Sequence, residues 1–103
     1  MVYHVYIVEC NDKSYYTGIT NNLERRLIEH NSSGDTKSYT YQKRPVRLVF
    51  CQEFSDANLA IAFEKQVKGW SRKKKEAIIE NEWHKLPELS KNKKLRDEED
   101  SNL

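Results

Sequence analysis

The stretch YYTGITNNLERRLIEHN, residues 15–31, contains the clearest signals for the fold of this chain. Its first six residues, YYTGIT, are rich in aromatic and β-branched side chains and predict a strand. Asn21 is followed three residues later by Glu24, a capping-box pattern that predicts the start of a helix. We therefore expect a strand that leads directly into a helix.

The segments on either side of this stretch predict two further strands. Residues 2–9, VYHVYIVE, are apolar on both alternating faces, which is typical of a central strand that is covered on each side. The turn formers in CNDKS, residues 10–14, join it to YYTGIT as a hairpin. VRLVFCQEF, residues 46–54, predicts the third strand. The polar segment between residues 31 and 45 predicts an exposed loop.

Two more helices are expected after the third strand. Ser55 is placed to cap the first of them and Gly69 to end it, and Ser71 is placed to cap the second. The apolar stripes of these helices are expected to consist of Leu59, Ala60, Phe63, Val67 and Trp70, and of Ala77, Ile78 and Ile79.

The predicted order β-β-α-β-α-α gives an α/β fold of the α+β type, with a small, three-stranded, mainly antiparallel sheet flanked by about three helices. The 103 residues, 37% of them hydrophobic, suffice for one domain with one core. We place that domain at residues 1–85. Residues 86–103 are highly charged and are expected to form a disordered tail.

Composition excludes several classes of protein. There is no apolar run near the roughly 20 residues needed to span a bilayer and no signal-peptide pattern, so we expect a cytoplasmic protein without a membrane partner. The net charge of +2 is too small to indicate nucleic-acid binding by itself. Cys10 and Cys51 form no CxxC pair, which favours two reduced, packed thiols over a zinc site.

The first helix places two polar side chains on its apolar stripe. Leu23, Arg26, Leu27 and His30 follow the i, i+3, i+4, i+7 spacing of one helix face. Arg26 and His30 are therefore expected at the edge of the core. Two interpretations are open: a packed histidine with an arginine that extends past it to water, or an anion site at the rim of the core.

Tyrosines on the first two strands are the next candidates. Alternation places Tyr6 on one face of its strand together with His4, and Tyr16 lies on the second strand. Half-buried packing is the ordinary role of a strand tyrosine. Gly18 is a further signal near Tyr16, because glycine inside a strand often marks either a bulge or the close approach of another group.

Glu64 and a group of cations complete the candidates. Glu64 lies at the border of the apolar stripe of its helix, where a carboxylate either is solvated or faces a cleft and suits Mg²⁺. Cations in the first turn of the third helix oppose the helix dipole, which an external phosphate would offset, although a solvated charge run is the alternative. The candidate nucleic-acid-binding residues are Lys37, Lys43, Arg44, Lys68, Arg72, Lys73 and Lys74.

Taken in order, these segments resemble the GIY-YIG nuclease domain, and most closely its short stand-alone members. HVYIV resembles the Gly-Ile-Tyr segment, YTG resembles Tyr-Ile-Gly, LERRLIEH resembles the helix with the catalytic arginine, and AFEKQ resembles the segment with the metal-binding glutamate. The resemblance runs over roughly residues 2–80. His4 stands where the family name has glycine.

This resemblance implies a role for each candidate. Arg26 would bind the scissile phosphate, and His30 would assist proton transfer or position a water. Glu64 would hold one divalent ion, Mg²⁺ or Mn²⁺, that stabilises charge on the phosphate and the leaving oxygen. Tyr6 and Tyr16 would help to deprotonate the attacking water, and either could be the base.

The resemblance implies a metal-dependent DNA endonuclease that leaves 5′-phosphate and 3′-hydroxyl ends. A lone domain of this size is expected to contact backbone and to select branched, flapped or single-stranded structures, as in repair or recombination. A protein partner could supply further specificity. One alternative is a nucleic-acid-binding module without turnover. The other is a protein-interaction domain, which would show no salt-dependent affinity for DNA.

Overall fold

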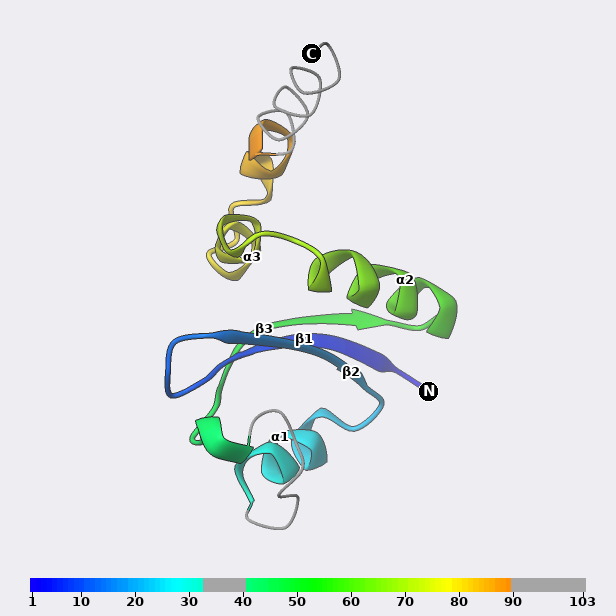
Figure 1. Ribbon diagram of the computed structural model, residues 1–103. Coiled ribbons are helices and arrows are strands. Elements are labelled where there is room, and N and C mark those ends of the chain that lie inside the picture. The colour runs from blue at the N-terminus through cyan, green and yellow to red at the C-terminus, as the bar shows by residue number, and fades with distance from the viewer. Residues whose placement is uncertain (33–40, 90–103) are drawn as a thin grey trace, which may run out of the picture. The chain divides into compact units, whose positions relative to one another are not determined.

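The computed structural model describes residues 1–32 and 41–89 and contains the predicted three-stranded sheet. Strand β1 (Tyr3–Glu9) lies between β2 (Tyr15–Thr20) and β3 (Arg47–Phe54), and both pairings are antiparallel (Figure 1). The predicted fold class, strand order in the chain and central position of β1 are confirmed. The helices are α1 (Leu23–Asn31), α2 (Ala57–Lys68) and α3 (Arg72–Ile79), with short 3₁₀ turns η1 (Tyr41–Lys43) and η2 (Trp83–Lys85).

The chain divides into two compact units, residues 1–69 and 70–103. The first unit contains the sheet, α1 and α2, and the second contains α3 and η2. Of the tail expected at residues 86–103, residues 86–89 are helical and the remainder lies outside the described residues. No helix in the described ranges is long and apolar enough to cross a membrane.

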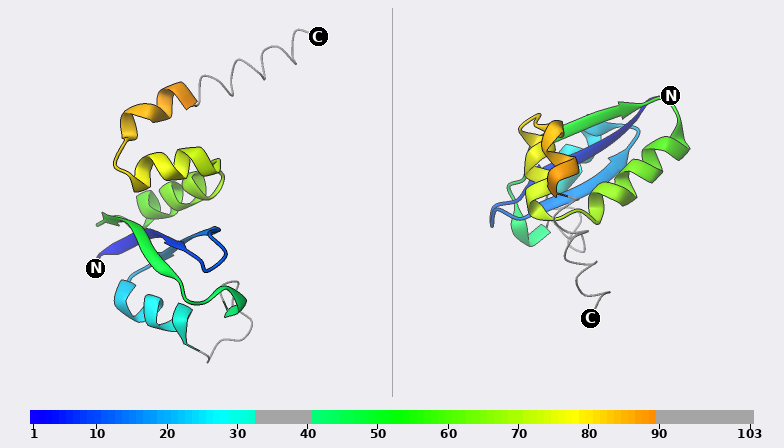
Figure 2. Two further views of the ribbon diagram at one scale, coloured as in Figure 1. Left: turned by 90° about the vertical axis from the view of Figure 1, so that its left-hand side faces the viewer. Right: turned by 90° about the horizontal axis from the view of Figure 1, so that it is seen from above.

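The two faces of the sheet are covered by different helices. Tyr6 lies opposite Gly18 of β2 and Cys51 of β3, and its side chain packs with residues of α1. The intervening residues Val5 and Ile7 are fully buried on the other face, which α2 covers (Figures 1 and 2). Because side chains alternate along a strand, each β1 residue is assigned to one helix or the other.

The helix caps differ from the sequence-based expectation in two of three cases. Asn22, not Asn21, caps α1, because its side chain accepts a hydrogen bond from Arg25 N. Asp56, not Ser55, caps α2 and accepts hydrogen bonds from two backbone amides. Ser71 caps α3 as predicted. In both incorrect cases two adjacent residues can cap, and the entry path of the backbone selects the second.

The buried face of α2 also differs from the prediction. It is formed by Ala60, Glu64 and Val67, at i, i+4 and i+7, whereas Leu59 is 61% exposed. Phe63 lies beside this face, with its ring 5.4 Å from the ring of Phe54 on β3. The expected stripe was wrong at Leu59, and Glu64 lies within the buried face rather than at its border.

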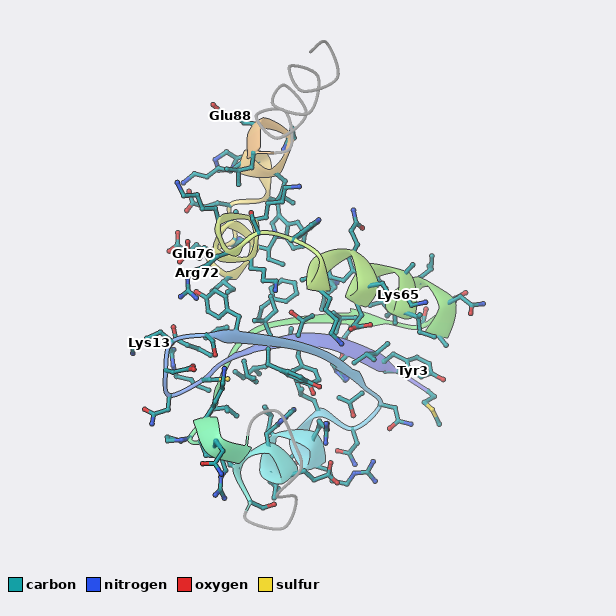
Figure 3. The ribbon with its side chains drawn as sticks, in the orientation of Figure 1. Tyr3, Lys13, Lys65, Arg72, Glu76 and Glu88 are labelled. Atoms are coloured by element: carbon teal, nitrogen blue, oxygen red, sulfur yellow. The ribbon has the colours of Figure 1, made fainter. Side chains whose placement is uncertain are left out.

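Two side chains fix the ends of the segment that joins α1 to β3. Asn31 accepts a hydrogen bond from Val46 N at 2.8 Å and donates one to Val46 O at 3.2 Å. Lys43, on η1, contacts Asp12 in the hairpin turn at 3.1 Å and donates to Ser14 Oγ at 3.3 Å. Figure 3 labels Tyr3, at the start of β1, and Lys13, in the hairpin turn that Lys43 contacts.

Candidate active site

Tyr6 and His30 form the buried centre of the candidate site. The Tyr6 hydroxyl lies 2.8 Å from His30 Nε2, and both residues are almost inaccessible to solvent. Tyr6 reaches this position from the central strand and His30 from the last turn of α1. His30, on the apolar stripe of α1, is therefore buried in the core.

Arg26 lies one turn before His30 and connects this centre to solvent. Its guanidinium is hydrogen-bonded to the hydroxyls of Tyr6 and Tyr16 and to the carboxylate of Glu29, which lies 3.2 Å from Nη1. The Arg26 side chain is 32% exposed. An arginine whose stem is packed and whose fork remains accessible can bind an oxyanion with two parallel N–H bonds.

Tyr16, on β2, is the fourth member of the cluster, which consists of Tyr6, Tyr16, Arg26 and His30. Its ring centroid is 5.1 Å from that of His30 and 6.5 Å from that of Tyr6. Tyr16 is half-buried, whereas Tyr6 is fully buried. Of the two tyrosines, Tyr16 is therefore the one whose hydroxyl a solvent molecule or substrate can approach.

The electrostatics of Tyr6 determine what its hydroxyl can do. Burial raises the pKa of Tyr6 to about 12, although the hydrogen bond and charge of Arg26 act in the opposite direction. Burial alone lowers the pKa of Arg26, but hydrogen bonds to Tyr6, Glu29 and Tyr16 outweigh it and raise that pKa. At neutral pH Tyr6 is therefore a phenol and Arg26 is a cation.

These protonation states orient the hydrogen bonds. A guanidinium only donates, so the Tyr6 oxygen accepts from Arg26, and the same oxygen lies 2.8 Å from His30 Nε2. The site therefore combines a cation that can bind phosphate with a phenol and an imidazole that share a hydrogen bond.

The comparison with known proteins agrees with this arrangement. The family described as the GIY-YIG catalytic domain matches residues 2–77, which include all four residues of the cluster. The chain belongs to this family. Its GIY-YIG domain therefore consists of the sheet, α1, α2 and most of α3.

Relatives and solved structures support the same assignment. The chain is 42% identical over 78 residues to a UPF0213 protein of Haloquadratum walsbyi, covering 76% of this chain and 86% of that one. It is 44% identical to one of Staphylococcus haemolyticus, covering 76% and 94%. The solution structure of a UPF0213 protein from Bacillus halodurans is similar with a TM-score of 0.52 at 41% identity, covering 78% and 84%. A solution structure of an E. faecalis protein gives 0.56 at 34% identity, with the same coverage.

Glu64 is not part of the cluster on the α1 face. It lies on α2, which covers the opposite face of the sheet, and its carboxylate is 3.3 Å from Lys68 Nζ. Glu64 is 9% exposed. On the same sheet face, buried Thr17 has a hydroxyl that bonds to no described residue. The structure therefore separates the expected metal ligand from the expected phosphate ligand by the thickness of a sheet.

Glu64 nevertheless suits a hydrated divalent cation. The described residues contain no group of three or more His, Cys, Asp or Glu side chains that could hold a metal. Mg²⁺ typically binds one or two carboxylates and keeps several waters, so a single glutamate agrees with its preferences. The Lys68 side chain is 60% exposed and can move away from the carboxylate.

His4 occupies the position at which the GIY-YIG name has glycine. It lies on the same face of β1 as Tyr6, and its Nε2 is 3.2 Å from Glu53 Oε1 on β3. Its buried Nδ1 has no hydrogen-bond partner within the described residues. His4 therefore contacts β3, whereas Arg26 and His30 are the residues that contact the Tyr6 hydroxyl.

The predicted nucleic-acid-binding cations have mixed surroundings. Lys43 is engaged by Asp12 in the hairpin turn, and Lys68 is engaged by Glu64. In the second unit, Arg72 pairs with Glu76 at 3.4 Å (Figure 3), and Lys74 lies 5.8 Å from the centre of the Trp70 ring. Arg44 is half-buried, Lys73 is exposed, and Lys37 lies outside the described residues.

The two cysteines also differ in their environments. Cys10 is buried in the core cluster with Tyr6 and Val8, as predicted. Cys51 is exposed, so its expected packing as a small hydrophobe was wrong. The α1 face of β3 is only partly covered, which explains why this thiol reaches solvent.

Sequence reasoning missed two residues of the site. Glu29 contacts Arg26, and its negative charge also contributes to the raised pKa of Tyr6. Asn31 holds the end of α1 against the start of β3. The i, i+3 spacing of Arg26 and Glu29 is a detectable signal, because oppositely charged residues at that spacing are helix neighbours. No local pattern predicts the Asn31 contact, which joins residues 15 positions apart.

Proposed function

We propose that this chain is a metal-dependent endonuclease that hydrolyses phosphodiester bonds in DNA. The observation that carries the proposal is the Arg26 guanidinium, accessible on one side and held on the other by two tyrosine hydroxyls, one of which is bonded to His30. Membership of the GIY-YIG catalytic domain family supports it.

In this proposal Arg26 binds the oxygens of the scissile phosphate. Its bonds to Tyr6 and Tyr16 fix the guanidinium plane, so little conformational freedom is lost when the phosphate binds. The positive charge lies beside the phosphate oxygens, on which negative charge develops in the transition state.

Proton transfer is assigned to the hydroxyl and imidazole groups. The oxygen of the attacking water forms a bond to phosphorus as one of its protons passes to a hydroxyl or imidazole group of the site. The bond from phosphorus to the 3′-oxygen breaks, and that oxygen takes up a proton. The products are a 5′-phosphate and a 3′-hydroxyl. Tyr16 is the hydroxyl that water can approach, and Tyr6 acts behind it as a positioning residue for His30 and Arg26.

The proposed cofactor is a single Mg²⁺ or Mn²⁺ held by Glu64. The role that the family resemblance gives this ion, stabilising negative charge on the phosphate and on the leaving oxygen, would require the DNA to reach both faces of the sheet. Because the Glu64 carboxylate is nearly buried, few bulk water molecules compete with the metal ion for its oxygens. Lys68 would have to leave the carboxylate, which predicts stronger metal binding in a Lys68→Ala variant.

We further propose that the substrate is a branched, flapped or single-stranded DNA, processed in repair or recombination. A small domain that positions itself through phosphate contacts carries little base-specific information and instead selects backbone shape. A protein partner could add specificity.

One observation favours the alternative of a binding module without turnover. Glu64 lies on the sheet face opposite Arg26 and is already paired with Lys68, so a DNA-binding function that needs no metal accounts for the cluster equally well. In this alternative the cations bind phosphate and tyrosines stack on unpaired bases.

The decisive experiment is cleavage of end-labelled branched, flapped, single-stranded and duplex DNA with Mg²⁺ or Mn²⁺. Wild type is compared with Arg26→Ala and Glu64→Gln, and with Arg25→Ala as the control. Arg25 is adjacent to Arg26, but its side chain is 65% exposed and its contact with Glu29 is long, at 3.9 Å. Its replacement therefore removes the same charge from a position outside the group of Tyr6, Tyr16, Arg26 and His30.

The endonuclease proposal predicts cleavage by wild type and Arg25→Ala, and a loss of at least about a hundredfold in the other two variants, as for removal of one transition-state donor. Glu64→Gln is expected to retain or strengthen DNA binding. Binding without cleavage of any substrate, unchanged in Glu64→Gln, would establish the binding module instead. A DNA affinity that is absent at low salt would exclude both.

A further inference from the structure

Glu29 is a charged residue at the edge of the site that the proposed reaction does not use. Its Oε1 atom lies 3.2 Å from Nη1 of Arg26, and its Oε2 atom lies 3.9 Å from Nε of Arg25. The Glu29 side chain is 47% exposed. It directly precedes His30 in α1 and lies one turn after Arg26.

We propose that Glu29 is a displaceable latch that occupies the phosphate-binding edge of Arg26 until a substrate phosphate replaces it. This inference rests on the proposed function, because it assigns Arg26 to phosphate. It makes Glu29 a residue that sets substrate affinity without taking part in bond cleavage.

The contacts of Arg26 show that Glu29 is not needed to hold it. The hydroxyls of Tyr6 and Tyr16 already anchor the guanidinium, and both are neutral partners that leave its positive charge uncancelled. Glu29 is the partner that cancels that charge. A carboxylate and a phosphate present similar oxygen pairs to an arginine fork, so the two anions compete for the same donors.

The exposure of Glu29 makes the exchange feasible. A nearly half-exposed carboxylate regains its hydration when it swings away, so its departure leaves no unpaired buried charge. Arg25, which is also exposed, lies on the same side and can retain a loose contact with it. The exchange therefore requires a side-chain rotation and no movement of the helix.

Glu24 provides a matched control. It carries the same charge on the same helix, lies in the first turn and is exposed. Replacing it with glutamine changes the net charge by the same amount as replacing Glu29. A difference between the two variants therefore reports the position of the charge and not the charge itself.

The test is metal-free titration with inorganic phosphate, followed by the NMR signals of the Arg26 side chain. We expect Glu29→Gln to bind phosphate up to about fivefold more tightly than wild type, as for loss of an exposed ion pair, and Glu24→Gln to stay within about twofold. The gain should disappear in a Glu29→Gln variant that also carries Arg26→Ala.

Other outcomes overturn the latch. Weaker phosphate binding in Glu29→Gln would show that Glu29 supports Arg26 rather than competing for it. Equal gains in both glutamine variants would reduce the effect to net charge, and absence of phosphate binding at Arg26 in every variant would remove the site. Because no DNA is cut in this assay, the latch and the nuclease proposal can fail separately: a phosphate gain without DNA cleavage retains only the latch.

Discussion

Gly18 lies directly opposite Tyr6 in the β1–β2 pairing, and the Tyr6 ring fills the space that a side chain at Gly18 would need. A Cβ atom at Gly18 would lie 2.6 Å from Tyr6 Cζ and would overlap the hydroxyl oxygen. No glycine in the described residues has a positive φ, so space and not backbone conformation requires glycine here.

Gly18→Ala is expected to destabilise the fold by about 1–3 kcal/mol, because the buried Tyr6 ring must shift within a packed core. The shift should also lengthen the hydrogen bond between Tyr6 and His30. Chemical denaturation measures the first effect. Gly69→Ala is the control: its Cβ would lie 3.7 Å from the backbone oxygen of Gln66, and we expect a change below about 1 kcal/mol.

The raised pKa of Tyr6 predicts a loss of stability at alkaline pH. The folded chain holds the proton up to a pKa of about 12, whereas an unfolded tyrosine releases it near 10. Between these values the unfolded state binds fewer protons, so stability is complete below pH 10 and falls by about 1.4 kcal/mol per pH unit as the pH rises through the window.

Tyr6→Phe isolates this contribution. The variant lacks the ionisable group, so the stability difference between wild type and Tyr6→Phe should shrink between pH 9.5 and 11.5. Urea denaturation at several pH values within that range, at constant salt, measures the difference. Parallel pH profiles for the two proteins would contradict the assignment of the raised pKa to Tyr6.

Asn31→Ala should weaken the junction of α1 with β3. The substitution leaves the amide and carbonyl of Val46 without their side-chain partner in a partly buried position, which costs about 1–3 kcal/mol. Thermal denaturation gives the stability, and the NMR signal of the adjacent His30 imidazole reports whether the site moves. Asn21→Ala, in an exposed position, is the control and should change stability by less than about 0.5 kcal/mol. Equal effects of the two substitutions would show that the Asn31 contact has no special weight.

The sequence predicted the strands and helices to within a residue or two because their signals are local. Apolar residues on both faces identified β1 as central, and turn formers identified the hairpin. The errors arose where two neighbouring residues satisfy the same rule. Asn21 and Asn22 can both cap a helix, and only the path of the backbone between β2 and α1 selects Asn22.

The site was predictable in part for a related reason. Helix spacing placed Arg26 and His30 on one face, strand alternation placed Tyr6 on one face of its strand, and the family resemblance joined them in one site. The position of Glu64 relative to that group depends on which face of the sheet α2 covers, and periodicity within α2 carries no information about this choice. Leu59 is exposed and Glu64 is buried, whereas Leu59 was expected in the apolar stripe and Glu64 at its border.

The double hydrogen bond between Asn31 and Val46 has a consequence for variation in chain length. It holds the two ends of the segment between residues 32 and 45 next to each other. Since the entropy of closing a loop grows only slowly with its length, a change in chain length before η1, whose Lys43 contacts the hairpin turn, is expected to cost little. The catalytic domain can thus acquire a longer or different recognition insert at this point while Arg26 and His30 keep their places.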